Sequence, residues 1–240
     1  MEFAEEDTGI WRLFDLQPGA AGTIIVVAGV VALVLVLAGR PWRVARNVIT
    51  IVHEAGHAVI GLLAGRRLQG IRLHSDTSGV TVSRGKVEGP GMVLTTLAGY
   101  PAPALLGLLF AALVSADRMP AVLTVAGVLL LGVLVMVRNA YGVFAVLVSA
   151  AVLFVVAFLA GPGPQAAFVY LMTWFLLLGG VRPVFELQTK RRRGVARDSD
   201  ADQLARLTGL PAAIWILVLA VLTVSCLVLG GMLLVEPALQ

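Results

Sequence analysis

Long apolar runs recur along the chain, and they constrain its fold more than any other feature. Each run has about 17 to 25 residues, the length that a helix needs to cross the hydrocarbon core of a bilayer. Hydrophobic types make up 59% of the 240 residues and charged types only 13%, whereas about a quarter of a soluble domain is charged. The sequence therefore predicts an all-α integral membrane protein with about six to seven transmembrane helices. The runs fall at residues 23–39, 47–64, 91–115, 120–137, 142–160, 165–181 and 211–235.

Residues 66–88 differ from these runs because polar and apolar side chains alternate there. Ile71 and Leu73 alternate with arginine and histidine, and Val80 and Val82 alternate with threonine and serine, on either side of "SDTSG". Alternation with a period of two around a turn-rich centre is typical of a β-hairpin. We expect a small membrane-associated hairpin at this place.

Two clusters of basic residues predict the membrane topology. Arg40, Arg43 and Arg46 precede the second apolar run, and residues 190–193 precede the last one. The positive-inside rule places both clusters in the cytoplasm, but seven plain crossings would leave the second cluster outside. The conflict disappears if the hairpin segment re-enters the membrane beside a polar cavity. It also disappears if the number of spans is even.

The segment "IVHEAGHAVIGLLAG", residues 51–65, carries three ionisable side chains inside an apolar run. His53 and His57 are four positions apart, so a helix places both imidazoles on one face about 6 Å apart, where they can bind one zinc ion. Glu54 is offset around the helix and suits the role of general base toward metal-activated water. Ionisable groups are costly within a span and usually functional. The motif predicts a zinc peptidase site about 10 to 16 Å beyond Arg46, nearer the cytoplasmic face.

At these residues the chain resembles the site-2 protease family of intramembrane zinc metalloproteases. The resemblance rests on "HEAGHAVIGLLAG" within a span, on the polar hairpin after it, and on "LAGYPAPALLG" in the following helix. It is strongest toward a bacterial branch of such membrane peptidases that end in a segment like "SDADQLARLTGLPAAIW". The resemblance implies proteolysis of a membrane protein substrate. Within a single polytopic domain of residues 1–240, we place the metalloprotease core at about 45–115 and 182–235.

A catalytic zinc ion needs a third protein ligand, and here the sequence departs from the family. The family supplies an aspartate from an Asn-Pro-Asp-Gly or Leu-Asp-Gly motif, and neither string occurs in this chain. By ligand type and reach the candidates are Asp200, Asp202 and His74, with Glu186 and Asp198 further away, and we expect Asp200 to be the ligand. The string "DADQ" also fits a capping box in which Asp200 is the N-cap, and a carboxylate can serve both purposes.

The prolines of "GYPAPALLG" predict a kink in the helix that follows the hairpin. Pro101 and Pro103 remove backbone donors from an apolar helix and free carbonyls that need other partners. One interpretation is a kink that serves packing alone. The other is that the kink and Tyr100 line the active-site cavity.

Together these features predict a zinc-dependent intramembrane endopeptidase that cleaves membrane-embedded or membrane-proximal protein segments. We expect Zn²⁺ to be bound by His53, His57 and Asp200. Glu54 would take a proton from the attacking water and later pass it to the leaving amine. The substrate would unwind and pair with the hairpin edge as an added strand. We expect a multi-pass protein of the cell membrane, with a membrane protein substrate and the lipid bilayer as partners and with no nucleic acid partner, because residues 190–193 lack stacking aromatic neighbours.

Two other functions fit part of the pattern. A non-catalytic membrane scaffold or regulator could retain the zinc site, although it would have no use for Glu54 as a base. A divalent-metal transporter would need ligands along a path near the bilayer midplane, whereas the ionisable residues here cluster at one place.

Overall fold

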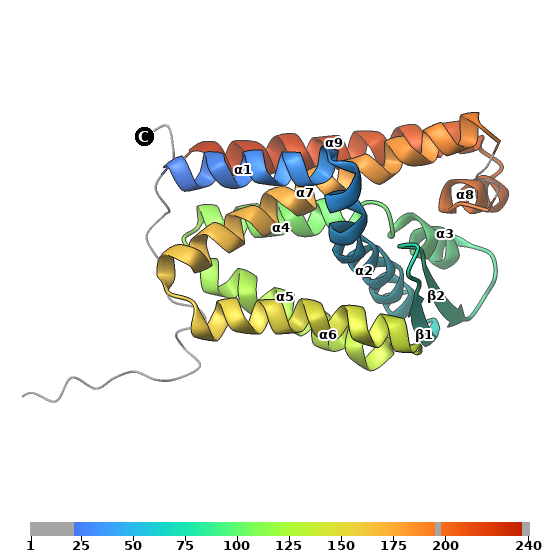
Figure 1. The fold of residues 1–240 in the computed structure, drawn as a ribbon. Helices are drawn as coiled ribbons and strands as arrows, with labels where there is room; N and C mark the ends of the chain where they lie inside the picture. The colour runs from blue at the N-terminus through green and yellow to red at the C-terminus, as the bar shows by residue number, and fades with distance from the viewer. Residues whose placement is uncertain (1–21, 195–197, 237–240) are drawn as a thin grey trace, which may run out of the picture.

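The computed structural model describes residues 22–194 and 198–236, which form helices and one two-stranded sheet (Figure 1). The predicted combination of a helical membrane protein with a small hairpin is confirmed. A π-helical turn, η2 (Val155–Leu159), continues α6. The other elements are α1 (Gly22–Leu37), α2 (Gly39–Leu63), β1 (Arg67–Leu73), β2 (Gly79–Arg84), α3 (Pro90–Leu97), α4 (Ala102–Ser115), α5 (Met119–Met136), α6 (Ala140–Phe154), α7 (Pro162–Arg192), α8 (Asp200–Thr208) and α9 (Ala212–Val235).

Four described helices are long and apolar enough to cross a membrane: α5, α6 with its π-helical turn, α7 and α9. Two further pairs reach that length only together, and each is bent at a break: α1 with α2 by 102°, and α3 with α4 by 69°. The described residues therefore provide four to six candidate spans, as a multi-pass membrane protein requires. They provide no seventh span, because the first two apolar runs form one bent pair.

The break between α1 and α2 is held by a polar network from α7. Pro41 lacks an N–H group, so it cannot continue the hydrogen bonds of α1. Arg182 donates to the carbonyl of Val36 at the end of α1, and its guanidinium lies 4.6 Å from the ring centroid of Trp42. Glu186 accepts hydrogen bonds from Arg182 (2.7 Å) and from Trp42 Nε1 (3.1 Å). These contacts fix the point where α2 turns away from the bundle.

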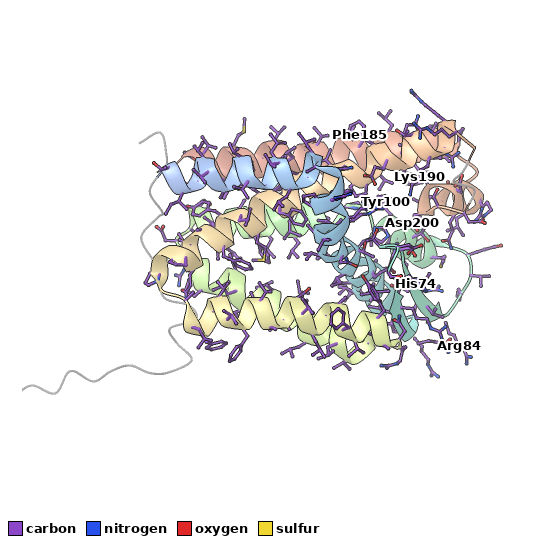
Figure 2. All side chains as sticks on the ribbon, viewed as in Figure 1. His74, Arg84, Tyr100, Phe185, Lys190 and Asp200 are labelled. Carbon is purple, nitrogen blue, oxygen red and sulfur yellow. The ribbon has the colours of Figure 1, made fainter. Side chains whose placement is uncertain are left out.

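The bend between α1 and α2 alters the membrane topology expected from the basic residues. The hairpin, α3 and α8 lie at one end of the bundle, and the connections from α4 to α5 and from η2 to α7 lie at the other (Figure 1). Arg84 and Lys190 both lie toward the hairpin end (Figure 2). If each bent pair is one span, four crossings separate the hairpin from residues 190–193, so Arg84 and those basic residues share one side without re-entry of the hairpin. Arg40, Arg43 and Arg46 then lie at the break inside the first span. That this side is the cytoplasm stays a prediction.

The helices form two layers with α2 between them. Helices α1, α4, α7 and α9 pack together in one layer, α5 and α6 form the other, and α2 runs obliquely across the space between (Figure 1). Small residues allow α4 and α7 to approach closely. A Cβ atom at Gly107 would lie 2.9 Å from the backbone nitrogen of Leu177, and one at Gly180 would lie 2.8 Å from that of Ala104. Glycine contacts of this kind are typical of membrane helix packing.

Strands β1 and β2 pair antiparallel within the segment predicted to form a hairpin. The outer edge of β1 is tied to the turn between α5 and α6. Ile71 bridges to Val137, and the Asn139 side chain accepts from Leu73 N (3.1 Å) and donates to Leu73 O (2.6 Å). The amide thus replaces a neighbouring strand. The membrane association of the hairpin stays a prediction.

Candidate metal centre and active site

Helix α2 carries the three ionisable residues of the HEAGH motif. The Nε2 atoms of His53 and His57 lie 3.1 Å apart, and their rings meet edge to face with centroids 4.7 Å apart. Glu54 is 3% exposed and faces the hairpin, where its Oε2 accepts a hydrogen bond of 2.5 Å from Thr81 Oγ1 on β2. The helical repeat therefore directs the two imidazoles toward one point and places the carboxylate beside them.

Asp200 reaches the same point from α8. Its Oδ2 atom lies 3.4 Å from His53 Nε2 and 3.2 Å from His57 Nε2. The three atoms form a nearly equilateral triangle and could hold one metal ion. Tetrahedral zinc with bonds of about 2.0–2.2 Å keeps its ligand atoms about 3.3–3.6 Å apart. Asp200 Oδ2 is also buried without a hydrogen-bond partner among the described residues, and a cation would satisfy it. The residues therefore fit a metal ion.

The carboxylate of Asp200 is ionised at neutral pH, as a metal ligand must be. Burial by itself raises the pKa of Asp200, but the imidazoles of His53 and His57 outweigh that effect and hold the pKa below its ordinary value.

The backbone of α3 orients His57. His57 Nδ1 lies 2.7 Å from the carbonyl oxygen of Thr95, so Nδ1–H donates and the lone pair of Nε2 faces the cluster. Thr95 lies in the last turn of α3, where helix carbonyls lack intrahelical partners. A metal-binding histidine usually has such an orienting hydrogen bond on its other nitrogen.

Two glycines leave the space that the cluster occupies. A Cβ atom at Gly99 would lie 2.3 Å from His57 Nε2 and 2.7 Å from His53 Cε1, and one at Gly79 would lie 2.5 Å from Glu54 Oε1. Neither glycine, nor Thr81, was predicted from the sequence as part of the site. Each glycine lies in a string that the sequence pattern had marked for another reason, Gly99 in "LAGYP" and Gly79 in "SDTSG".

The predicted kink after the hairpin is confirmed as the 69° bend between α3 and α4. Tyr100 lies within the break, and its ring meets the His53 ring edge to face with centroids 4.9 Å apart. Figure 2 places Tyr100 near Asp200. The kink therefore presents an aromatic side chain to the candidate metal centre.

Helix α8 begins one residue before the predicted position. The N-cap is Ser199, whose Oγ accepts from the backbone N–H of Asp202, while Asp202 accepts from the N–H of Ser199. The prediction of Asp200 as N-cap is wrong, because the hydroxyl of Ser199 fills that role. Asp200 is therefore free to reach α2, and α8 is anchored by Ala201 and Leu204, which are fully buried.

The structure separates the other proposed ligands from the cluster. Asp202 pairs with Arg191 at the end of α7. His74 is exposed in the hairpin turn, where its Nδ1 lies 3.3 Å from Ser78 Oγ. Asp198 is exposed beside Arg206, and Glu186 belongs to the network at the α1–α2 break. Of the predicted candidates, Asp200 is the one that the structure brings to both histidines.

Fold and site together define a multi-pass helical membrane protein with a candidate metal centre built from α2 and α8. A family model described as "Peptidase M50B-like" matches residues 26–230. The chain belongs to this family, which is a site-2 protease family, and the resemblance found in the sequence is confirmed. Membership makes a membrane metalloprotease the broad functional class. Comparisons with curated proteins and with solved structures gave no significant match.

Proposed function

We propose that the chain is a zinc-dependent intramembrane endopeptidase that cleaves membrane-embedded or membrane-proximal protein segments. One observation carries the proposal: His53 Nε2, His57 Nε2 and Asp200 Oδ2 lie within 3.4 Å of one another beside the buried Glu54. Two imidazoles and one carboxylate form a ligand set of catalytic zinc sites, in which a fourth position stays open. Family membership supports the protease class.

The chemistry divides between the metal ion and Glu54. When bound, zinc would polarise the scissile carbonyl and lower the pKa of a water molecule. Glu54 would accept a proton from the attacking water on its carboxylate and pass it to the leaving amine. Thr81 Oγ1 donates a hydrogen bond to one oxygen of that carboxylate. The other oxygen, Oε1, lies beside Gly79, where a Cβ atom would come within 2.5 Å of it. The hairpin would thus keep the base in one orientation.

The substrate would bind as a strand along the outer edge of β2. A transmembrane helix must unwind first because its peptide bonds are hydrogen-bonded internally. Within the described residues β2 makes backbone hydrogen bonds only to β1, whose own outer edge is tied to Asn139. Thr81 on β2 contacts Glu54. A strand added to β2 would therefore run beside the general base.

The active site would lie nearer the cytoplasmic face of the cell membrane. The hairpin, α8 and the labelled basic residues Arg84 and Lys190 lie at the same end of the bundle (Figure 2). The positive-inside rule assigns that end to the cytoplasm.

The two rival functions have weaker support. A scaffold that retained the metal site would not need a buried glutamate held by Thr81. A metal transporter would need several ligand groups along a path, and the described part of the chain contains a single cluster of three or more potential ligands.

The test is Glu54→Gln in the full chain, reconstituted in liposomes with a library of single-span membrane peptides and read by mass spectrometry. We expect a normal zinc content and a loss of cleavage of about 10²- to 10⁴-fold. Glu88→Gln is the matched control, because Glu88 is an exposed glutamate outside the cluster, and it should cleave normally. Retained cleavage by Glu54→Gln would overturn the mechanism, and metal-free wild-type protein that still cleaves would overturn the role of zinc.

A further inference from the structure

An apolar cavity of about 880 Å³ lies between the two helix layers, against α2. On α2 it is lined by Val44, Val48, Ile51 and Ala55, which recur every three or four residues along one face of the helix. At 100° per residue this face is opposite to the one that carries His53. None of the four active-site residues lines the cavity. It is therefore separated from the candidate metal centre by the thickness of α2.

Polar residues line the cavity chiefly where α2, the hairpin turn and the start of α6 meet. They include Arg40, Arg43, Asn47 and Tyr141, and none of the described residues that line the cavity is an aspartate or a glutamate. Tyr141 Oη donates to Asn47 Oδ1 at 3.0 Å and links α6 to α2 there. Elsewhere the lining is almost entirely aliphatic and aromatic. The cavity is thus amphipathic, with a positive charge on its polar part.

The two arginines have no partner within the described residues. Arg40 and Arg43 are exposed, and neither forms a hydrogen bond or ion pair with any side chain or carbonyl described by the structure. Both lie in a helix pair that counts as a candidate span, where charged side chains normally pair with something. A guanidinium binds phosphate through two parallel hydrogen bonds, so an anionic phosphate group is the natural complement.

An apolar cavity of this size does not stay empty in a bilayer, because its lining would lose dispersion contacts on one side. Acyl chains supply those contacts. A substrate peptide is a poorer occupant, since it would meet the face of α2 turned away from Glu54. We propose that the cavity binds an anionic phospholipid, with its acyl chains against Val44, Val48 and Ile51 and its phosphate between Arg40 and Arg43. This site is independent of the proposed peptidase activity.

The first test is native mass spectrometry of the purified full chain, titrated with phosphatidylglycerol, with phosphatidylcholine and with inorganic phosphate. We expect the wild type to bind phosphatidylglycerol in preference to both. The double variant Arg40→Gln/Arg43→Gln should lose about 30-fold in affinity for it. The matched control, Arg192→Gln/Arg193→Gln, removes the same charge from exposed positions outside the cavity and should bind as the wild type does.

A second pair of variants tests the apolar part. Val148 is exposed and lines the cavity, whereas its neighbour Leu147 is equally exposed and does not. Val148→Trp should fill the cavity and weaken lipid binding about tenfold or more, and Leu147→Trp should have no effect. A photo-crosslinker at position 148 should capture lipid in membranes.

Several results would overturn the proposal. One is that phosphatidylcholine or inorganic phosphate binds the wild type as tightly as phosphatidylglycerol does. Another is that Arg40→Gln/Arg43→Gln and Val148→Trp both keep the wild-type affinity for phosphatidylglycerol. A third is that the crosslinker at position 148 captures a protein segment in place of lipid.

Discussion

Asp200 Oδ2 lies 3.2 Å from His57 Nε2, although α8 and α2 are far apart in the chain. The contact depends on three local events: the Ser199 cap, the burial of Ala201 and Leu204, and the hydrogen bond from His57 to Thr95. The candidate metal centre is therefore a product of how α8 docks.

Zinc content will distinguish Asp200 from Asp202. Asp200→Ala removes a ligand atom, so we expect its zinc affinity to fall by at least about 100-fold. Asp202→Asn removes the ion pair with Arg191 but no atom of the triangle, so zinc should remain bound. Elemental analysis of dialysed protein measures both. A zinc-free Asp202→Asn beside a zinc-loaded Asp200→Ala would reverse the assignment.

Gly99→Ala should weaken metal binding. The added methyl group would lie 2.3 Å from His57 Nε2, so His57 must rotate away from the cluster. We expect zinc affinity to fall by about 10- to 100-fold, as it does when groups that orient a ligand are lost. Gly132→Ala on α5 has open space at its Cβ and should keep full zinc content. Normal zinc content in Gly99→Ala would show that the cluster has more room than the structure gives it.

Thr81→Val should slow cleavage without loss of zinc. The change removes the hydrogen bond that holds the Glu54 carboxylate. A hydrogen bond to a charged group contributes about 1.5–3 kcal/mol, so kcat should fall about 10- to 100-fold. Thr81→Ser should restore it. Thr50→Val is the control, because Thr50 Oγ1 donates to Thr77 O in the hairpin (2.9 Å) and not to the Glu54 carboxylate. An equal loss in Thr50→Val would mean that the effect is on the hairpin as a whole.

The docking of α8 should weaken in acid. Burial raises the pKa of Asp202, but hydrogen bonds from Ser199 and Arg191 outweigh it, and the pKa lies below its ordinary value. A depressed folded-state pKa adds stability above the unfolded value of about 3.9 and loses it as the pH falls through the folded value. Asp202→Asn should therefore lower Tm at neutral pH, and its difference from the wild type should shrink below about pH 4. Asp198→Asn, on an exposed side chain, should show no such convergence. A constant difference would exclude Asp202 as the titrating group.

Local patterns in the sequence were enough for part of the site. The spacing of His53 and His57 and the position of Glu54 need only a helix, and α2 forms over them. Period-two alternation likewise predicted a small two-stranded sheet, and β1 and β2 pair antiparallel. The capping box was misplaced by one residue, because Ser199 and Asp200 are both good N-caps and only the path of the chain selects between them. The apolar runs at 23–39 and 47–64 were counted as two spans, because apolar length alone does not reveal that α2 begins at Gly39, beside the point where Arg182 donates to the end of α1.

By itself the sequence determined that this is a helical membrane protein with a histidine pair and a glutamate on one helix, because composition and helical periodicity are properties of neighbouring residues. It also reduced the third ligand to a few acids and His74. Only the tertiary structure brings Asp200, rather than the other candidates, to the two histidines, and only it revealed Gly99, Thr81 and the cavity behind α2. Those relationships join segments distant in the chain, and their geometry depends on packing between helices rather than on any local pattern.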